Sequence, residues 1–256
     1  MSTATRRWRS LSAPRRLVVE LMRASRGIPT VTAERRINLS QLIEARKNAA
    51  VRPAWSVIIA KAFAMVAATT PLLRTSYISF PWPHLCEHSE PVVGIALERE
   101  YQGEEAVFFT QIRRPHTLSL VELDVHLRHA KETPVESVAS FRRSLDLARL
   151  PWPLRGWLMR FALHASGRWR ERFFGTFGIS SPAAAGAGML HLISPLACAL
   201  HYGLFDEQGR LDVRLTFDHR VLDGATAARA LAALDGVLCN EILTEIRTLE
   251  RPKLAA

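Results

Sequence analysis

The stretch HYGLFDEQGRLDVRLTFDHRVLDGATAARAL, residues 201–231, decides the fold. Apolar and other residues alternate on both sides of the turn at 206–209, which is typical of a β-hairpin with one face on the core. The second strand ends in DHRVLDG at 218–224, and alanines and leucines then recur at helical spacing. The stretch therefore predicts a hairpin, a short polar motif at its end, and a long helix with one apolar stripe.

Strands and helices interleave along the rest of the chain. Helices are expected from Pro14, over 40–47, over 57–68 with Ser56 as its cap, and over 118–131; strands are expected over 28–37, 75–79, 92–97 and 106–112. This alternation favours a single α/β domain. We expect residues 1–12 to form a basic flexible arm and residues 13–256 to form the domain, with a helical insertion rich in tryptophan and arginine at about 132–172.

Composition excludes several classes of protein. The chain has 256 residues, 48% of them hydrophobic and 23% charged, which allows a sizeable core and excludes a disordered tail. Its net charge of +10 comes mostly from scattered arginines, so we interpret it as a compositional bias and expect no nucleic-acid partner. The longest nearly uncharged stretch, 180–205, is broken by prolines and glycines and fits two buried strands better than a membrane helix.

Cellular location is predicted from the cysteines and the first residues. The three cysteines are odd in number and far apart, which predicts no disulfide framework and favours a reducing compartment. The first sixteen residues lack the apolar core of a secretory signal. We therefore expect a cytoplasmic protein.

Residues 151–174 of the insertion are expected to be helical. Pro151 and Pro153 suit a helix start, and Trp157, Phe161 and Ala165 recur every four residues. Its arginines are expected to face water or acidic groups: Arg155, Arg160, Arg168 and Arg170. Two interpretations stay open, because the segment could pack on the domain or a partner subunit near the site, or could form a basic amphipathic surface on a membrane.

The motif DHRVLDG carries candidate chemistry. His219 stands where a strand ends, and a neutral imidazole there can take a proton from a hydroxyl or thiol near neutral pH. Asp223 and Gly224 stand at the start of the following helix, where a carboxylate is stabilised by the helix N-terminus and could hold an arginine in place. A histidine at a strand end can equally be structural, so the motif alone does not establish catalysis.

DHRVLDGATAARAL resembles the signature of the acyltransferase catalytic domain of 2-oxoacid dehydrogenase complexes, which shares its fold and an HxxxDG motif with chloramphenicol acetyltransferase. Five further segments resemble parts of that domain in the same order: RRLVVELMRASRGIP (15–29), LSQLIEARK (39–47), WSVIIAKAFAMVAATTP (55–71), EPVVGIALE (90–98) and GTFGIS (175–180). The resemblance covers most of residues 12–249 and is poorest at 132–172. It implies a two-layer α/β sandwich of the chloramphenicol acetyltransferase type, with a mixed sheet and helices on one face.

The resemblance also implies catalytic roles. In that family the histidine is the general base that deprotonates the acceptor, which implies this role for His219. A serine in the family's GTFTIS segment donates a hydrogen bond to the tetrahedral oxyanion; Ser180 matches it best, and Ser181 is the second choice. Active sites of this fold lie between the subunits of a trimer. The resemblance therefore implies a homotrimer or a multiple of it, and His219 and Ser180 could belong to different chains.

An orienting ion pair is implied in the same way. The family's motif aspartate pairs with an arginine near the first helix, which implies that Asp223 is partly buried against Arg15 or Arg16. The sequence does not choose between the two arginines. Gly224, next to Asp223, is expected to let the backbone pack closely.

The sequence departs from the family in several respects. We expect a relative without a lipoyl or subunit-binding domain; Ser181-Pro182-Ala183 replaces the usual NLG, and 132–172 is longer than the family needs. The resemblance thus indicates a stand-alone acyltransferase that moves an acyl group from a thioester, on coenzyme A or a carrier, to a thiol or hydroxyl. No covalent cofactor is expected, and a coenzyme A thioester is the expected co-substrate. The alternatives are a catalytically inactive trimeric scaffold of the same fold and a membrane-surface protein.

Other chemistry-bearing residues have weaker signals. His84, Cys86 and His88 could share one face of a strand and bind a metal, but the flanking prolines favour a loop and no fourth ligand is spaced to complete a site, so no metal is expected. Cys198 is expected in the core, and His191 and His201 are expected to be structural. Arg220 could support the site or meet a phosphate of coenzyme A.

Overall fold

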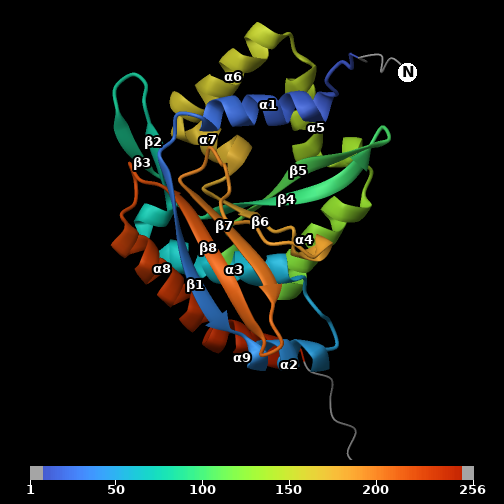
Figure 1. The fold of residues 1–256 in the computed structure, drawn as a ribbon, viewed down its shortest axis with the longest axis vertical. Helices are drawn as coiled ribbons and strands as arrows, with labels where there is room; N and C mark the ends of the chain where they lie inside the picture. The colour runs from blue at the N-terminus through green and yellow to red at the C-terminus, as the bar shows by residue number, and fades with distance from the viewer. Residues whose placement is uncertain (1–7, 250–256) are drawn as a thin grey trace, which may run out of the picture.

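The computed structural model describes residues 8–249. Its centre is a six-stranded sheet in the order β1–β8–β7–β6–β4–β5, beside which β2 and β3 form a separate hairpin (Figure 1). The strands are β1 (Thr30–Asn38), β2 (Thr75–Ile78), β3 (His84–Glu87), β4 (Val92–Tyr101), β5 (Glu104–Arg113), β6 (Phe177–Ser180), β7 (Cys198–Phe205) and β8 (Arg210–Asp218). Because β6 runs parallel to β4 and β7 while the other neighbours are antiparallel, the sheet is mixed, as predicted.

Nine α-helices lie in the described part of the chain. They are α1 (Ala13–Ser25), α2 (Ser40–Asn48), α3 (Trp55–Thr69), α4 (Leu120–Glu132), α5 (Ala139–Arg149), α6 (Trp152–His164), α7 (Gly167–Phe174), α8 (Gly224–Val237) and α9 (Leu243–Thr248). A single π turn, Leu238–Ile242, joins α8 to α9. The elements expected from the sequence before residue 131 are present with small shifts at their ends. No helix among residues 8–249 is long and apolar enough to cross a membrane.

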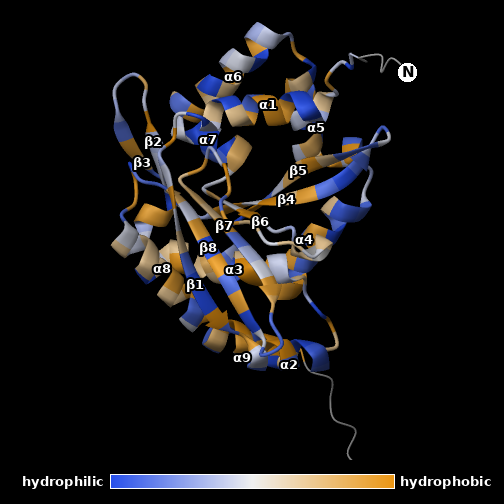
Figure 2. Cartoon of the chain, viewed as in Figure 1, coloured by the Kyte–Doolittle hydropathy of each residue, from blue (hydrophilic) through white to orange (hydrophobic). Residues whose placement is uncertain are grey.

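The main helical layer covers one face of the sheet. Helix α3 is apolar on nearly every side, so it is buried almost completely, and Phe63 packs edge-on against Phe177 of β6 at 4.9 Å between ring centroids. Helix α8 packs beside it over β1 and β8 (Figures 1 and 2). The prediction of Ser56 as the cap of α3 is wrong. Ala54 occupies the cap position, and its N–H donates to Asp124 of α4 at 2.8 Å.

A second group of helices stands over the opposite face at the β4–β5 end, which the prediction of helices on one face did not include. Alternate residues of β4 show the two environments: Ile95 belongs to the α3 core, whereas Ala96 faces α1 and α5–α7. Helices α1, α5 and α6 have their own small core of Leu17, Leu21, Ala148, Met159 and Leu163. This group exists because the insertion carries apolar stripes that need burial.

The insertion is helical, as expected, but two of its arginines are buried. Arg155 is 7% exposed and donates to Glu20 of α1, and Arg170 is 1% exposed and donates to three backbone carbonyls. The expectation that these arginines face water or acidic groups holds for Arg155, which meets the Glu20 carboxylate, and is wrong for Arg170, which meets backbone carbonyls. Each guanidinium ties separate segments together. Burial lowers the pKa of Arg170 to about 10, so it stays charged at neutral pH. Instead, aromatic side chains are exposed: Trp152, Trp157 and Trp169 are 63%, 60% and 47% accessible.

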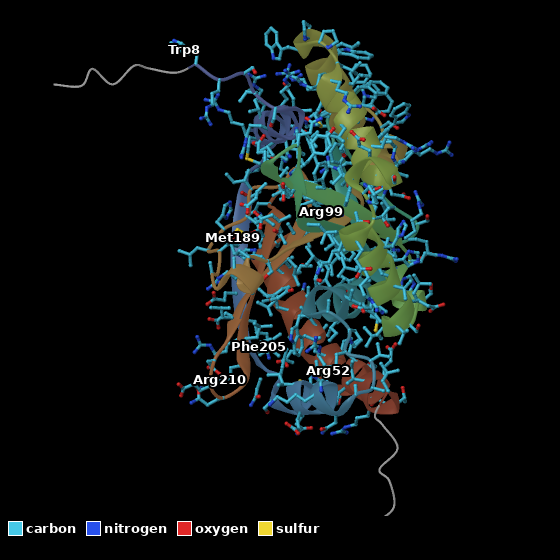
Figure 3. The ribbon with its side chains drawn as sticks, turned by 90° about the vertical axis from the view of Figure 1, so that its right-hand side faces the viewer. Trp8, Arg52, Arg99, Met189, Phe205 and Arg210 are labelled. Carbon is cyan, nitrogen blue, oxygen red and sulfur yellow. The ribbon has the colours of Figure 1, made fainter. Side chains whose placement is uncertain are left out.

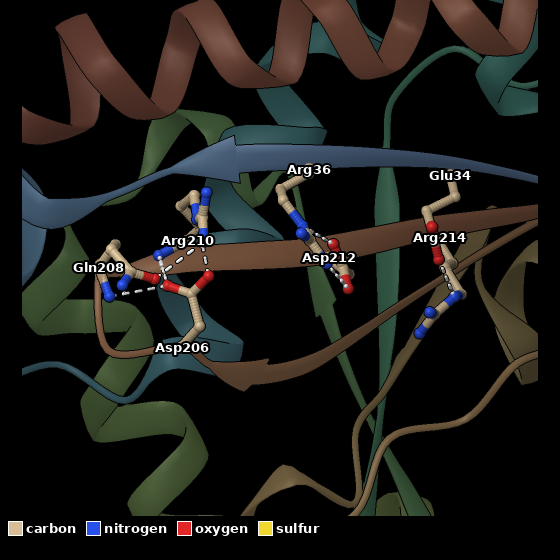
Figure 4. A network of polar contacts seen from close by, with 7 residues as sticks. All are labelled: Glu34, Arg36, Asp206, Gln208, Arg210, Asp212 and Arg214. Carbon is tan, nitrogen blue, oxygen red and sulfur yellow. Dashed lines mark hydrogen bonds and ion pairs between the residues drawn. The ribbon is translucent and has the colours of Figure 1, made fainter.

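The solvent side of the β1–β8 pair is polar. Arg36 of β1 makes a bidentate pair with Asp212 of β8, at 2.7 and 3.0 Å, and Arg214 pairs with Glu34 (Figure 4). The pair with Arg36 lowers the pKa of Asp212. Figure 3 shows Phe205 and Arg210 at one end of the β7–β8 hairpin and Met189 on the outer side of the sheet. Of the expected basic arm at 1–12, residues 1–7 lie outside the described residues.

Candidate active site

His219 follows the last residue of β8 and is held there by its backbone. Its N–H donates to Pro29 O at 2.9 Å, next to the start of β1, which fixes the direction in which the strand ends. The side chain is 49% exposed, and Nδ1 lies 4.0 Å from Oδ1 of Asp223. An imidazole with this exposure is accessible to an incoming hydroxyl or thiol. The structure therefore places a candidate base on a rigid strand end.

The residues on either side of His219 form an ion-paired clamp, in which Asp218 is buried and Arg220 is partly exposed. Asp218 is fully buried and accepts from the N–H, Nε and Nη2 of Arg220 at 3.0, 2.9 and 2.8 Å. The Arg220 guanidinium also lies 4.1 Å from the ring centroid of Tyr77 in β2. The clamp fixes the backbone that carries the candidate base. Sequence reasoning missed this pair, although the D-x-R spacing at the end of a strand could have indicated it.

The ion pair expected at Asp223 is not found in the described chain. Asp223 is the N-cap residue of α8, but its side chain is 85% exposed and its polar neighbour is His219. Arg15 lies 3.7 Å from Glu104, and Arg16 donates to Leu11 O at 2.9 Å. Within one chain the expected pairing is therefore wrong. Within the DHRVLDG motif, the buried carboxylate held by an arginine is Asp218.

Gly224 begins α8, and the space around it is open. A Cβ placed on Gly224 would meet no atom of residues 8–249 within 4 Å. The expected close packing of backbone at this position is not seen in this part of the chain. In the next turn of the helix, Ala227 is fully buried and belongs to the core.

The two candidate serines have different environments. Ser181 donates to Tyr202 O at 2.8 Å and accepts from the N–H of Ala183 at 3.2 Å, so its hydroxyl is used in the loop. Ser180 is the last residue of β6, is partly exposed and lines an apolar cavity of about 370 Å³ between the sheet and α1, α5, α6 and α7. Of the two, Ser180 has the hydroxyl that can donate to a bound molecule.

His219 and Ser180 lie far apart within one chain. Each follows or ends a strand, but β6 is parallel to β7 and β7 is antiparallel to β8, so β6 and β8 run in opposite directions and their carboxyl ends do not meet at one edge of the sheet. Ser180 is level with Arg214, four residues before the end of β8. His219 is five residues beyond Arg214 and two strands from Ser180, so at about 3.3 Å per residue and 4.8 Å between strands the separation is about 19 Å. One chain cannot bring both side chains to one reacting centre.

The remaining histidines have structural surroundings. The expected loop at 84–88 is instead strand β3, and His88 follows it with Nε2 3.0 Å from Ser76 Oγ and Nδ1 3.2 Å from Glu171 Oε2. Among the described residues, no three His, Cys, Asp or Glu side chains are grouped as metal ligands. Cys198 is fully buried, and burial raises the pKa of its thiol. These residues hold the β2–β3 hairpin and the core.

His191 and His201 lie near the β6–β7 region, as expected. His191 contacts Thr30 Oγ1 at 3.1 Å and Thr32 Oγ1 at 2.9 Å. His201 is fully buried beside Ser180 in the sheet register, and burial lowers its pKa. Neither of its ring nitrogens makes a hydrogen bond with the described residues. His201 therefore lies in the core as a neutral imidazole.

Comparison with known proteins identifies the fold. No family model and no curated protein matches the sequence. A probable dihydrolipoamide acetyltransferase from Listeria monocytogenes superposes with a TM-score of 0.63 and 16% identity, covering 99% of both chains. The cubic core of a pyruvate dehydrogenase multienzyme complex has a TM-score of 0.67 and 18% identity, covering 94% of this chain and 95% of that one.

A third similar structure is also an acetyltransferase. The dihydrolipoamide acetyltransferase of Azotobacter vinelandii has a TM-score of 0.66 and 18% identity, covering 94% of this chain and 95% of that one. A serine, a histidine and an asparagine have been investigated in its catalytic mechanism, the last two four positions apart. At these identities the likeness establishes that the chain has the α/β fold of acyltransferase cores, as predicted.

Proposed function

We propose that the protein is an acyltransferase that moves an acyl group from a thioester to a thiol or hydroxyl, with His219 as general base. The observation that carries the proposal is the half-exposed His219 at the clamped end of β8, on a fold shared with acetyltransferase cores. The spacing of His219 and Asp223 equals that of the histidine and asparagine of the Azotobacter enzyme. The donor is proposed to be a coenzyme A or carrier thioester in the cytoplasm.

The proposed reaction has two steps. His219 takes the proton of the acceptor S–H or O–H, and the acceptor attacks the thioester carbonyl to form a tetrahedral oxyanion. The Ser180 hydroxyl donates a hydrogen bond to that oxyanion, which typically contributes a factor of about 10²–10³ in rate. When the carbon–sulfur bond breaks, the leaving thiolate takes the proton from the imidazolium. The acyl group is then on the acceptor, and the base is neutral again.

The proposed site lies between two subunits. Because His219 and Ser180 are about 19 Å apart within one chain, the base of one chain is proposed to meet the serine of the next, which a trimer or a multiple of it would allow. Mixing the inactive variants His219→Ala and Ser180→Ala at equal amounts is expected to restore about a quarter of the sites by random pairing. Neither variant alone regains activity. Mixed oligomers without activity would contradict the shared site.

The function is tested with a panel of acyl-coenzyme A donors and a cell extract as the source of acceptors. Mass spectrometry is expected to show a product that carries the acyl group, formed by the wild type and not by His219→Ala. Arg160→Ala serves as the control, because Arg160 is an exposed arginine on α6. Equal product formation by the wild type and His219→Ala would refute the role of His219, and a folded oligomer without any product would favour the inactive scaffold.

A membrane-surface role is the second candidate, and a specific observation favours it. Trp157 and Phe161 stack at 5.6 Å between ring centroids, Trp169 lies edge-on to Phe161 at 6.0 Å, and all three side chains are exposed. Exposed aromatic residues among arginines suit the interface of an anionic bilayer. Sedimentation with anionic liposomes, compared between the wild type and Trp157→Ala, tests this contact separately from catalysis.

A further inference from the structure

We propose that the cavity beside Ser180 binds the aliphatic chain of the acyl donor, so that the substrates include fatty-acyl thioesters. This inference rests on the proposed acyl transfer. The cavity has a volume of about 370 Å³, within the range of small-molecule sites. If a water-sized group takes about 30 Å³, roughly a dozen non-hydrogen atoms fit, which corresponds to a medium-length chain.

The floor of the cavity is built from small residues on three neighbouring strands. Gly94 of β4, Gly178 of β6 and Ala199 of β7 are direct partners in the sheet register and line the cavity together. Ala96 lies two positions further along the same face, in the row of Ser180. Larger side chains at these positions would fill the space. The cavity therefore exists because this cross-strand row consists of glycine and alanine.

The roof is held in place by its own contacts and needs no ligand to support it. Arg155 of α6 donates to Glu20 of α1 at 3.2 and 3.3 Å, with both side chains buried. Arg170 of α7 donates to the carbonyls of Leu163 and Pro195 at 2.9 and 2.6 Å. The helices are thus fixed to one another and to the segment before β7. A cavity under a roof of this kind is preformed, which lowers the entropic cost of binding.

The lining chemistry selects an aliphatic chain. Most of the wall is apolar, and Leu17, Leu21, Phe109, Leu158 and Ile193 represent the elements that form it. Among the described lining residues, Arg143 is the one ionisable side chain, and it is exposed to solvent. The floor strands use their backbone groups to pair with each other, so an inserted peptide would find few partners for its own amides. A methylene chain has no such requirement.

Ser180 connects the cavity to the proposed chemistry. It lines the cavity at the end of β6, and its hydroxyl is the candidate donor to the oxyanion. A thioester carbonyl held at Ser180 would have its acyl chain directed along the small-residue floor. The cavity is then the part of the site that selects the length of the acyl group.

The test measures binding of free fatty acids, without any reaction. Octanoate and dodecanoate are titrated into the purified full-length oligomer by calorimetry, and affinity is expected to rise by about fourfold for each added methylene until the cavity is full. Ala96→Phe is expected to weaken dodecanoate binding at least tenfold, because the ring occupies the floor. Ala232→Phe, on the exposed side of α8, is the matched control and is expected to bind as the wild type does.

The outcomes separate this inference from the proposed function. Dodecanoate binding that is lost in Ala96→Phe with an unchanged melting temperature, together with transfer of an acetyl group by the wild type, supports both. The same binding result without transfer from any acyl-coenzyme A supports the chain site and refutes the function. Absence of dodecanoate binding to the wild type, or equal binding by Ala96→Phe, overturns the inference even if acetyl transfer is observed.

Discussion

Replacing Arg220 by alanine is expected to destabilise the protein strongly, although Arg220 is on the surface side of the motif. The change leaves the Asp218 carboxylate fully buried without its bidentate partner. Removing one member of a buried pair typically costs about 3–5 kcal/mol. For a chain of this size each kcal/mol lowers the melting temperature by about 2–4 °C, so a decrease of about 10 °C is expected.

The reverse change is expected to cost less. In Asp218→Ala the guanidinium of Arg220, whose side chain is 30% exposed, can regain water and keep its contact with Tyr77. We therefore expect Asp218→Ala to lower the free energy of unfolding by about 2–3 kcal/mol, which is less than the range for a fully buried pair. The double variant Asp218→Ala/Arg220→Ala is expected to be more stable than Arg220→Ala alone, because it leaves no unpaired buried carboxylate.

Asp223→Ala is the decisive comparison. Asp223 lies five residues after Asp218 in the same motif, but its side chain is 85% exposed, so the change is expected to stay within about 0.5 kcal/mol. The measurement is thermal and urea unfolding of the four variants, with oligomer size followed by light scattering. A loss of stability in Asp223→Ala as large as in Arg220→Ala would refute the assignment of the structural ion pair to Asp218.

Three further predictions concern the candidate site and its surroundings. His219→Ala is expected to lower the rate of acyl transfer by about 10²–10⁴ with an unchanged melting temperature, because the half-exposed ring contributes little to packing; unchanged turnover would contradict the general base. Ser180→Ala is expected to lower kcat by about 10²–10³ without a change in stability. Ser181→Ala removes two hydrogen bonds to the backbone and is expected to lower the free energy of unfolding by about 1 kcal/mol. The opposite pattern would exchange the roles of the two serines. Burial lowers the pKa of His201, so below about pH 6.5 the unfolded chain binds a proton more readily than the folded chain, and the free energy of unfolding is expected to fall with the pH. In urea unfolding between pH 7 and 5, His201→Leu is expected to show a smaller decrease than the wild type. An equal decrease in both proteins would contradict the effect.

The core of the fold could be predicted from the sequence because periodicity and turn residues agree there. The hairpin of β7 and β8, the buried helix α3 and the motif before α8 all follow from local patterns. The position of α1 and α5–α7 over the second face could not be predicted. It depends on contacts such as Arg155 with Glu20, which join residues 135 positions apart and carry no local signal.

The candidate site shows the same limit. His219 and Ser180 could be found from short motifs, but their separation depends on the order and direction of β6, β7 and β8. Asp218 and Asp223 look alike in the sequence, and only burial distinguishes the carboxylate that holds Arg220 from the one that faces solvent. The small residues Gly94, Gly178 and Ala199 carry meaning only once the sheet register aligns them.

The topology has a consequence for how selectivity and catalysis would be distributed. Ser180 lines the cavity, whereas His219 is two strands away and five residues beyond the position level with Ser180, so a shared site would take acyl recognition from one subunit and proton transfer from its neighbour. Changes of the cavity floor, such as Ala96→Phe, would then alter the preferred acyl length without moving the base. Changes of the Asp218–Arg220 clamp would alter the base without altering the acyl preference. An oligomer that combines wild-type and Ala96→Phe subunits would therefore have two preferences for acyl length, although His219 would be the same base in every subunit.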